Sequence, residues 1–167
     1  MCAARLVVRD LRSEDHDDAL RMNNANVPAV SHLEPGELAS DLARARHAYA
    51  IGVDRLEAFC VTFPSGVADD LGVNYAWFAA RYPSFVYLDR VVVDEPYRSG
   101  GRGAALYAAV EDAMRRGDGP RLFTCEVNLR PRNDGSLRFH ARLGFAQVGE
   151  QESKPGLVVA MLAKTVA

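Results

Sequence analysis

Runs of apolar residues separated by polar turns define the expected strands of this chain. The strongest run, Phe-Val-Tyr-Leu-Asp-Arg-Val-Val-Val at residues 85–93, is rich in β-branched and aromatic side chains that favour extended backbone. Asp54 and Arg55 are expected to form a two-residue hairpin turn between two other runs. The further strands are predicted at residues 5–9, 47–53, 56–63, 121–127, 145–151 and 157–163.

Four segments are predicted as helices, at residues 13–23, 35–46, 102–116 and 134–143. Ser13 is expected to cap the first, Pro35 suits the first turn of the second, and Gly144 follows the last. Residues 64–83 are predicted as a long irregular stretch that packs over the core. Strands outnumber helices, so the fold class is α/β: one domain, residues 1–167, with a mixed, mostly antiparallel sheet of six to seven strands flanked by about four helices.

Composition and charge narrow the class of protein. The 167 residues are 49% hydrophobic and 25% charged with a net charge of −2, which indicates a globular chain and no nucleic-acid partner. No apolar run approaches the ~20 residues of a membrane span, and the start of the chain lacks the apolar stretch of a signal peptide. Cys2, Cys60 and Cys125 are odd in number and widely spaced, which predicts no metal site and a reducing, cytoplasmic location.

A glycine-rich segment at residues 98–103, Arg-Ser-Gly-Gly-Arg-Gly, lies between a predicted strand and a predicted helix. Unpaired backbone N–H groups at a helix start, with glycines that admit a ligand, predict a phosphate or pyrophosphate site, to which Arg98 and Arg102 add charge. A Walker loop is excluded because no Lys-Ser or Lys-Thr pair occurs, and the dinucleotide fingerprint fails at its third glycine. The alternative is a tight turn that only needs positive φ angles.

Two motifs in this part of the chain identify a family resemblance. Arg98-x-x-Gly101-x-Gly103 matches the pyrophosphate signature Q/R-x-x-G-x-G/A of the GNAT superfamily of acyl-CoA-dependent acyltransferases. Residues 133–145, Asn-Asp-Gly-Ser-Leu-Arg-Phe-His-Ala-Arg-Leu-Gly-Phe, resemble its second motif. The chain also looks like a branch of small predicted acetyltransferases with no assigned substrate. The resemblance implies a splayed central strand pair and acetyl-CoA, or another acyl-CoA, as cofactor.

The resemblance also assigns cofactor contacts. The backbone of Val91, Val92 and Val93 would bind the pantetheine and supply an oxyanion hole. Backbone amides of the glycine segment would hold the pyrophosphate, and polar residues further along would complete the site. The residues of the glycine segment are Arg98, Ser99, Gly100, Gly101, Arg102, Gly103 and Ala104. The polar residues further along are Asn128, Asn133, Ser136 and His140.

Three side chains are candidates for catalysis. His140 replaces the tyrosine that in much of the family protonates the CoA thiolate, so it is either a general acid or a histidine packed between helix and sheet. Asp89, inside an apolar strand, would accept the proton of the amine or pair with an interior arginine. Glu126 is a second candidate base, and Arg90 is expected to be structural.

The acceptor pocket is expected to be lined by amide and aromatic side chains: Asn23, Asn26, Tyr75, Trp77 and Tyr87. The alternative is a set of surface amides beside a small satellite core. Such a pocket suits a compact amine, so the predicted function is transfer of an acetyl group to a primary amine of a small molecule by direct attack. A non-catalytic acyl-CoA sensor is the alternative function, and a homodimer is possible because family members often dimerise.

Overall fold

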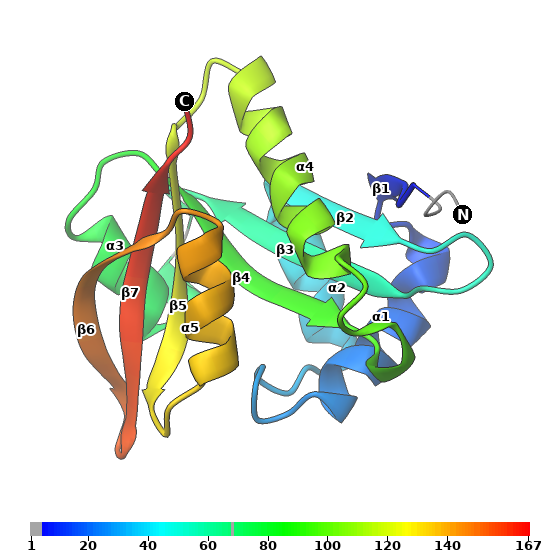
Figure 1. Cartoon of the computed structure of the whole chain (residues 1–167), viewed down its shortest axis with the longest axis horizontal. Coiled ribbons are helices and arrows are strands. Elements are labelled where there is room, and N and C mark those ends of the chain that lie inside the picture. Colours follow the sequence, from blue (N-terminus) through cyan, green and yellow to red (C-terminus); the bar gives the residue numbers. More distant parts are fainter. Residues whose placement is uncertain (1–4, 68) are drawn as a thin grey trace. The chain divides into compact units, whose positions relative to one another are not determined.

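A computed structural model describes residues 5–67 and 69–167 of the chain, and Cys2 therefore lies outside the described residues. The fold is α/β, with a seven-stranded sheet in the order β1-β2-β3-β4-β5-β7-β6 (Figure 1). Strand β2 pairs antiparallel with β1 and β3, β7 pairs antiparallel with β5 and β6, and β4 and β5 run parallel, which confirms the predicted mixed sheet. The strands are β1 (Val8–Asp10), β2 (His47–Ile51), β3 (Ala58–Pro64), β4 (Val86–Val93), β5 (Leu122–Arg130), β6 (Ala146–Lys154) and β7 (Leu157–Thr165).

Five α-helices occur in the described part of the chain, against the four expected. None of them is both long enough and apolar enough to cross a membrane. They are α1 (His16–Ala25), α2 (Pro35–Arg44), α3 (Val73–Ala79), α4 (Arg102–Arg116) and α5 (Asp134–Arg142).

The chain forms two compact units, and β4 passes from one into the other. The first unit holds the described residues up to Phe63 together with Asp89–Ala113. The second unit holds the described residues of Pro64–Leu88 together with Met114–Ala167. Each unit is described by itself below.

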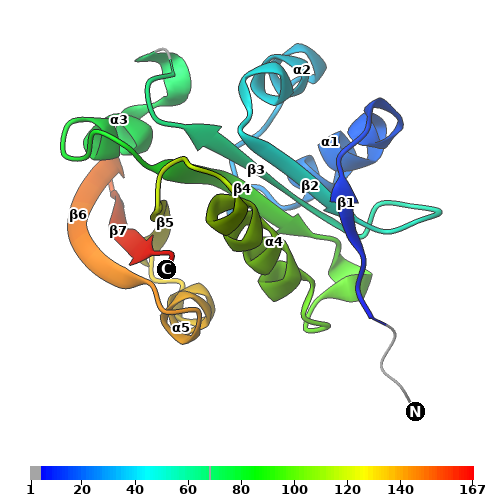
Figure 2. The same ribbon diagram turned by 90° about the horizontal axis from the view of Figure 1, so that it is seen from above.

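The core of the first unit is built around β3. Its residues from Ala58 to Phe63 are all buried, which is expected of a strand covered on both faces. Figure 2 shows α1 and α2 on one face of β2 and β3, and α4 on the opposite face. From α1, Ala19 and Met22 are fully buried.

Two local predictions for the first unit are wrong. Ser13 does not cap α1; it begins a short 3₁₀ turn, η1 (Ser13–Asp15), in which the Asp15 carboxylate accepts the N–H of Arg12 at 2.8 Å. The connection of β2 to β3 spans residues 52–57 instead of a two-residue turn. Gly52 leaves β2 with a φ of +121°, and the N–H of Glu57 bonds to the carbonyl of Ile51 at 2.8 Å. The expected turn lacks a glycine, so the chain turns at Gly52.

In the second unit α5 covers one face of β5 and β7, and α3 lies on the other side near β6 (Figures 1 and 2). The prediction of an irregular stretch over residues 64–83 is wrong, because it contains α3 and a 3₁₀ turn, η2 (Asp69–Leu71). Tyr75 and Phe78, three residues apart, form the buried face of α3. Five of its seven residues are weak helix formers, so tertiary packing stabilises this short helix more than local propensity does.

Candidate active site

The glycine turn, here residues 98–104, leads from the 3₁₀ turn η3 (Glu95–Tyr97) into α4. Ser99 and Gly101 have φ angles of 64° and 79°, the left-handed conformation that glycine adopts without strain. A Cβ atom added to Gly101 would meet no heavy atom within 4 Å. The backbone at Gly101 is therefore open to a close approach by a ligand.

Helix α4 starts with its amides directed into this turn. Its first intrahelical bond runs from the N–H of Ala105 to the carbonyl of Gly101 at 3.0 Å. The amides of Arg102, Gly103 and Ala104 precede that bond, so no carbonyl of the helix is available to them. Donors at the positive end of a 15-residue helix favour an anion. These groups fit a pyrophosphate.

The two arginines of the turn are each bonded to a neighbour within the first unit. The Nη2 of Arg98 donates to the side-chain oxygen of Asn26 at 2.6 Å. The Nε of Arg102 donates to Oε2 of Glu57 at 2.7 Å. Because Glu57 balances the charge of Arg102, the expectation that Arg102 simply adds positive charge to the site does not hold.

Strand β4 ends beside the turn. Val92 is buried, whereas Val91 and Val93 are half-buried, as the alternation of a strand requires. The N–H of Asp94 bonds to the carbonyl of Glu57 at 2.9 Å and fixes the end of the strand. The binding of pantetheine by Val91–Val93, and the splay of β4 from β5, stay predictions.

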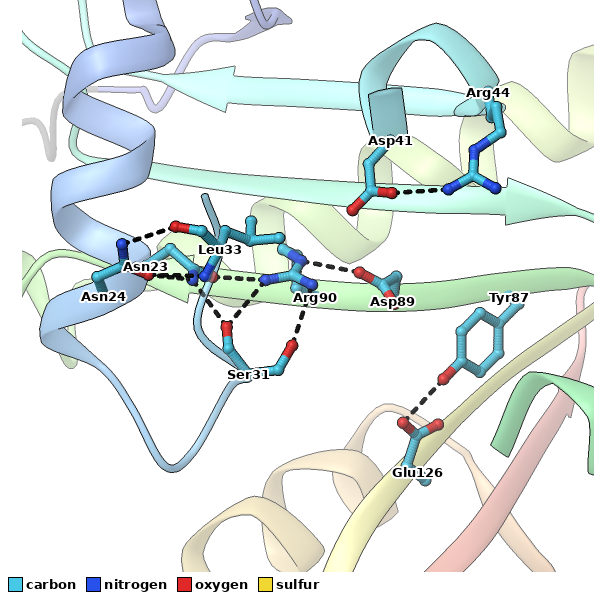
Figure 3. A network of polar contacts seen from close by, with 10 residues as sticks. All are labelled: Asn23, Asn24, Ser31, Leu33, Asp41, Arg44, Tyr87, Asp89, Arg90 and Glu126. Atoms are coloured by element: carbon cyan, nitrogen blue, oxygen red, sulfur yellow. Dashed lines mark hydrogen bonds and ion pairs between the residues drawn. The ribbon is translucent and has the colours of Figure 1, made fainter. Parts of the chain in front are cut away.

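Asp89 pairs with an interior arginine, its neighbour Arg90 (Figure 3). Arg90 is 7% exposed; its Nε donates to the Asp89 carboxylate at 2.8 Å, and its Nη1 donates to the side-chain oxygen of Asn23 at 2.7 Å. Further bonds join Arg90 to Ser31. A buried guanidinium requires a nearby carboxylate. Asp89 therefore serves as the counter-ion of Arg90, which was the structural alternative for this residue.

The loop between α1 and α2 is held by amide side chains at the end of α1. The Nδ2 of Asn23, a fully buried residue, donates to Asn24 at 3.0 Å and to the carbonyl of Ser31 at 2.9 Å. Asn24 exchanges two bonds with the backbone of Leu33, and Asn26 donates to the carbonyl of Met22. Both N–H groups of the Asn23 amide are used by Asn24 and Ser31, so Asn23 ties α1 to this loop instead of offering them to a ligand.

In the second unit a side-chain cluster forms around Glu126. The hydroxyl of Tyr87 donates to Oε1 of Glu126 at 2.8 Å (Figure 3), and the Nδ2 of Asn74 donates to the same oxygen at 3.3 Å. Gln151 of β6 in turn donates to the side-chain oxygen of Asn74 at 3.0 Å. We call Glu126, Tyr87 and Asn74 the Glu126 cluster. It combines a carboxylate with a hydroxyl and an amide, a set that can receive an ammonium group.

Tyr75 and Trp77, both predicted for the acceptor pocket, belong to α3. Tyr75 is 4% exposed and its hydroxyl donates to the carbonyl of Pro64 at 2.7 Å, while its ring meets Tyr87 edge-on. Trp77 carries the guanidinium of Arg81 over its ring, with the guanidinium carbon 3.8 Å from the ring centroid. Of the predicted aromatic residues, Tyr75 therefore supports the position of Tyr87 through ring packing.

Asn133, Ser136 and His140 lie on one side of α5, as their spacing predicts. Asn133 is the N-cap, and its side chain accepts the N–H of Ser136 at 3.1 Å. The Nδ1 of His140 lies 2.7 Å from the carbonyl of Ser136. Upstream of α5, the carbonyl of Asn128 accepts the N–H of Asn133 at 3.0 Å, next to an irregularity in the pairing of β5 with β7.

His140 is 5% exposed, and its ring packs edge-on against Phe139 and Phe145. Burial lowers the pKa of His140 below the ordinary 6.5, while the bond to the Ser136 carbonyl has a smaller, raising effect. A carbonyl only accepts, so Nδ1 carries a proton and donates it to Ser136. The imidazole is therefore mostly neutral at pH 7, and a neutral ring in this tautomer has no proton on Nε2 to give. This state does not favour the general-acid role.

The structure thus brings together part of the predicted set in each unit. The first unit contains the glycine turn and the Asp89–Arg90–Asn23 network, and the second contains the Glu126 cluster and the polar side of α5. Sequence reasoning missed Glu57 and Ser31 in the first unit, and Asn74 and Gln151 in the second. Their partners are 45 to 77 positions away in all four cases, and no local pattern signals such pairs.

Comparison with known proteins supports the same family as the two motifs. The model of the acetyltransferase (GNAT) family matches residues 40–145. The fold is similar to that of the ribosomal-protein-S18-alanine N-acetyltransferase from Escherichia coli (17% identity, covering 98% of this chain and 95% of that chain, TM-score 0.73). It is also similar to Arabidopsis thaliana NAA60 in complex with acetyl-CoA, with 14% identity, coverage of 97% of this chain and 100% of that chain, and a TM-score of 0.76. A further similar structure is Ard1 from Thermoplasma volcanium, with 15% identity, coverage of 97% of this chain and 98% of that chain, and a TM-score of 0.76. No curated protein gives a significant match.

Proposed function

We propose that the acceptor of this chain, which belongs to the acetyltransferase (GNAT) family and uses acetyl-CoA, is the primary amine of a small molecule. The observation that carries the proposal is the Glu126 cluster. Tyr87 is 2% exposed and donates to Glu126, so the carboxylate lies among buried groups where a compact ammonium group is matched better than a long chain. A carboxylate in such surroundings both attracts an ammonium group and accepts its proton.

The cofactor, when bound, supplies an acetyl thioester. The amides of the glycine turn would hold its pyrophosphate and the backbone of Val91–Val93 would hold its pantetheine, and the amides of that strand would supply an oxyanion hole. In the second unit Asn133 and Ser136 present polar groups on α5, and His140 packs that helix against Phe145. Glu126 accepts the proton of the amine.

The amine reacts directly, without an acyl-enzyme. Burial raises the pKa of Cys60 to about 12 and raises the pKa of Cys125 well above its ordinary value, so neither supplies a thiolate at neutral pH. No other nucleophile is needed, because the thioester is already activated.

A second candidate acceptor is the α-amino group of a protein. It is favoured by the fold neighbours, since the Escherichia coli structure is named as a ribosomal-protein-S18-alanine N-acetyltransferase and an NAA60 structure holds a bisubstrate analogue. Both candidates present the same reacting group, an unprotonated primary amine, and they differ in what surrounds it.

Release of free thiol from acetyl-CoA separates the two acceptors. The purified chain is incubated with a panel of small primary amines and, in parallel, with short peptides that begin with Ala, Met or Ser. Turnover on small amines alone is expected. Turnover on peptides alone would favour the second candidate, and calorimetric binding of CoA with no turnover on either panel would favour a non-catalytic sensor.

A further inference from the structure

Two backbone hydrogen bonds, one to each neighbouring segment, fix the position of Glu57. Its N–H bonds to the carbonyl of Ile51 at the end of β2, and its carbonyl accepts the N–H of Asp94 at the end of β4, at 2.8 and 2.9 Å. Its side chain is partly buried, with an exposed fraction of 23%. The carboxylate therefore lies at a fixed point of the first unit.

From this point Glu57 holds the guanidinium of Arg102, the first residue of α4. Besides the 2.7 Å bond to Glu57, Arg102 directs Nη1 toward the carbonyl of Tyr97 at 3.4 Å. The guanidinium carbon also lies 4.8 Å from the centre of the Tyr97 ring, a distance at which a cation is attracted to an aromatic face. The side chain of Arg102 thus folds back across the glycine turn toward Tyr97, which precedes the turn.

The side chain of Arg102 occupies the space next to Gly100. A Cβ atom at Gly100 would lie 2.5 Å from Nη1 of Arg102, whereas Gly101, with its positive φ, has open space instead. The two neighbouring glycines therefore have different surroundings. Gly101 admits a ligand, and Gly100 admits the side chain of Arg102.

We propose that Glu57 is a positioning residue, which through Arg102 holds the glycine turn in the shape that presents its amides to the pyrophosphate. The side chain of Arg102 then acts on the turn and is not itself a phosphate ligand, whereas its backbone amide still belongs to the site. The proposal rests on the binding of acetyl-CoA at this turn and is independent of the acceptor. Under the opposite arrangement Arg102 leaves Glu57 to bind phosphate, and Glu57 competes with the ligand. The two arrangements predict opposite signs when Glu57 is removed.

The test measures binding of CoA alone by titration calorimetry, with kcat at saturating acetyl-CoA as a second readout. Glu57→Ala is expected to weaken CoA binding about 10-fold, Glu57→Gln about 3-fold because the amide oxygen still accepts from Nε, and both should keep kcat within two-fold. Arg102→Met should weaken binding to the same extent as Glu57→Ala. The double variant should be no worse than either single variant, because the two residues act as one pair.

Asp15→Ala is the matched control. Asp15 pairs with Arg9 at 2.6 Å in the same unit, and that arginine has the same 18% exposure as Arg102. This variant is expected to lower the melting temperature and leave CoA binding unchanged. Tighter binding in Glu57→Ala, or unchanged binding in both Glu57→Ala and Arg102→Met, overturns the proposal. If Glu57→Ala does not fold, Arg102→Met and Glu57→Gln decide. Because CoA binding needs no acceptor, a wrong acceptor assignment leaves this test intact.

Discussion

The glycine turn and the Glu126 cluster differ in what they are made of. The turn presents backbone amides, and only the absence of side chains at Gly100 and Gly101 makes room there. The Glu126 cluster consists of side chains from α3, β4 and β5, at positions 74, 87 and 126. A backbone site depends on local conformation, so it leaves a compact pattern in the sequence. A side-chain cluster depends on which distant elements pack together, and it leaves none.

The largest effect is expected from Gly101→Glu in the turn. The new side chain would occupy the open space above Gly101 and repel the pyrophosphate, so CoA binding measured by calorimetry should fall at least about 100-fold. Forcing a side chain to a φ of 79° adds strain of about 1–2 kcal/mol.

Gly156→Glu is the control for that strain. Gly156 also has a positive φ, of 81°, with no heavy atom within 4 Å of an added Cβ, but it lies in the turn between β6 and β7. It should lose similar stability in urea unfolding and bind CoA normally. An equal loss of CoA binding in both variants would mean that strain, and not the turn as a ligand site, explains the effect.

The next largest effect is expected from Glu126→Gln. Glutamine keeps an oxygen for Tyr87 and Asn74 but loses the charge and the capacity to accept a proton. We expect kcat/KM for the acceptor to fall about 100-fold, with CoA affinity and the midpoint of unfolding unchanged. A variant with full activity would show that the Glu126 cluster is only structural.

A smaller effect on stability is expected from Gly149→Ala, which tests how α3 is held. Gly149 lies in β6 at an irregularity in its pairing with β7, and an added Cβ would collide with the ring of Trp77. Overpacking of this kind costs about 1–3 kcal/mol, measured by urea unfolding. Because α3 also carries Asn74, kcat should fall while CoA affinity stays constant.

Gly36→Ala in α2 is the matched substitution without a collision, since no heavy atom lies within 4 Å of its added Cβ. In a helix this change stabilises by up to about 1 kcal/mol. If Gly149→Ala is equally harmless, the contact of α3 with β6 through Trp77 is not what holds the helix.

The smallest effect is expected from pH, through two histidines in different units. Burial lowers the pKa of His47 to about 4 and also lowers the pKa of His140. The unfolded chain takes up these protons near pH 6.5, and the folded chain takes them up only at lower pH. The stability that the two neutral histidines contribute is therefore fully present above pH 6.5 and is lost as the pH falls toward 4. His47 is half-buried, so solvent screening limits its share to about 1 kcal/mol.

His47→Gln should reduce this acid-induced loss, because the amide can bond to Thr62 as the ring does at 2.9 Å and does not titrate. The measurement is urea unfolding of the wild type and the variant at pH 7.5 and 4.5. Identical pH dependence of the two proteins would contradict the lowered pKa of His47.

The prediction of α3 failed for a physical reason. Residues 73–79 contain valine and three aromatic residues, which are weak helix formers, and the burial of Tyr75 and Phe78 stabilises the helix. The asparagines at the end of α1 and just after it were predicted to line the acceptor pocket, but their amides bond to one another and to nearby backbone. Sequence indicates that such groups need partners, and it does not say which ones.

The sequence by itself determined the α/β class, the strands with strong apolar runs and the position of the glycine turn, because these depend on residues near one another in the chain. Only the tertiary structure decided that Asp89 neutralises Arg90, that Glu57 holds Arg102, and that Tyr87 and Asn74 meet at Glu126. Each of these depends on charges and hydrogen-bonding groups that must find partners once buried. Burial is a property of the packed units, and no stretch of sequence contains it.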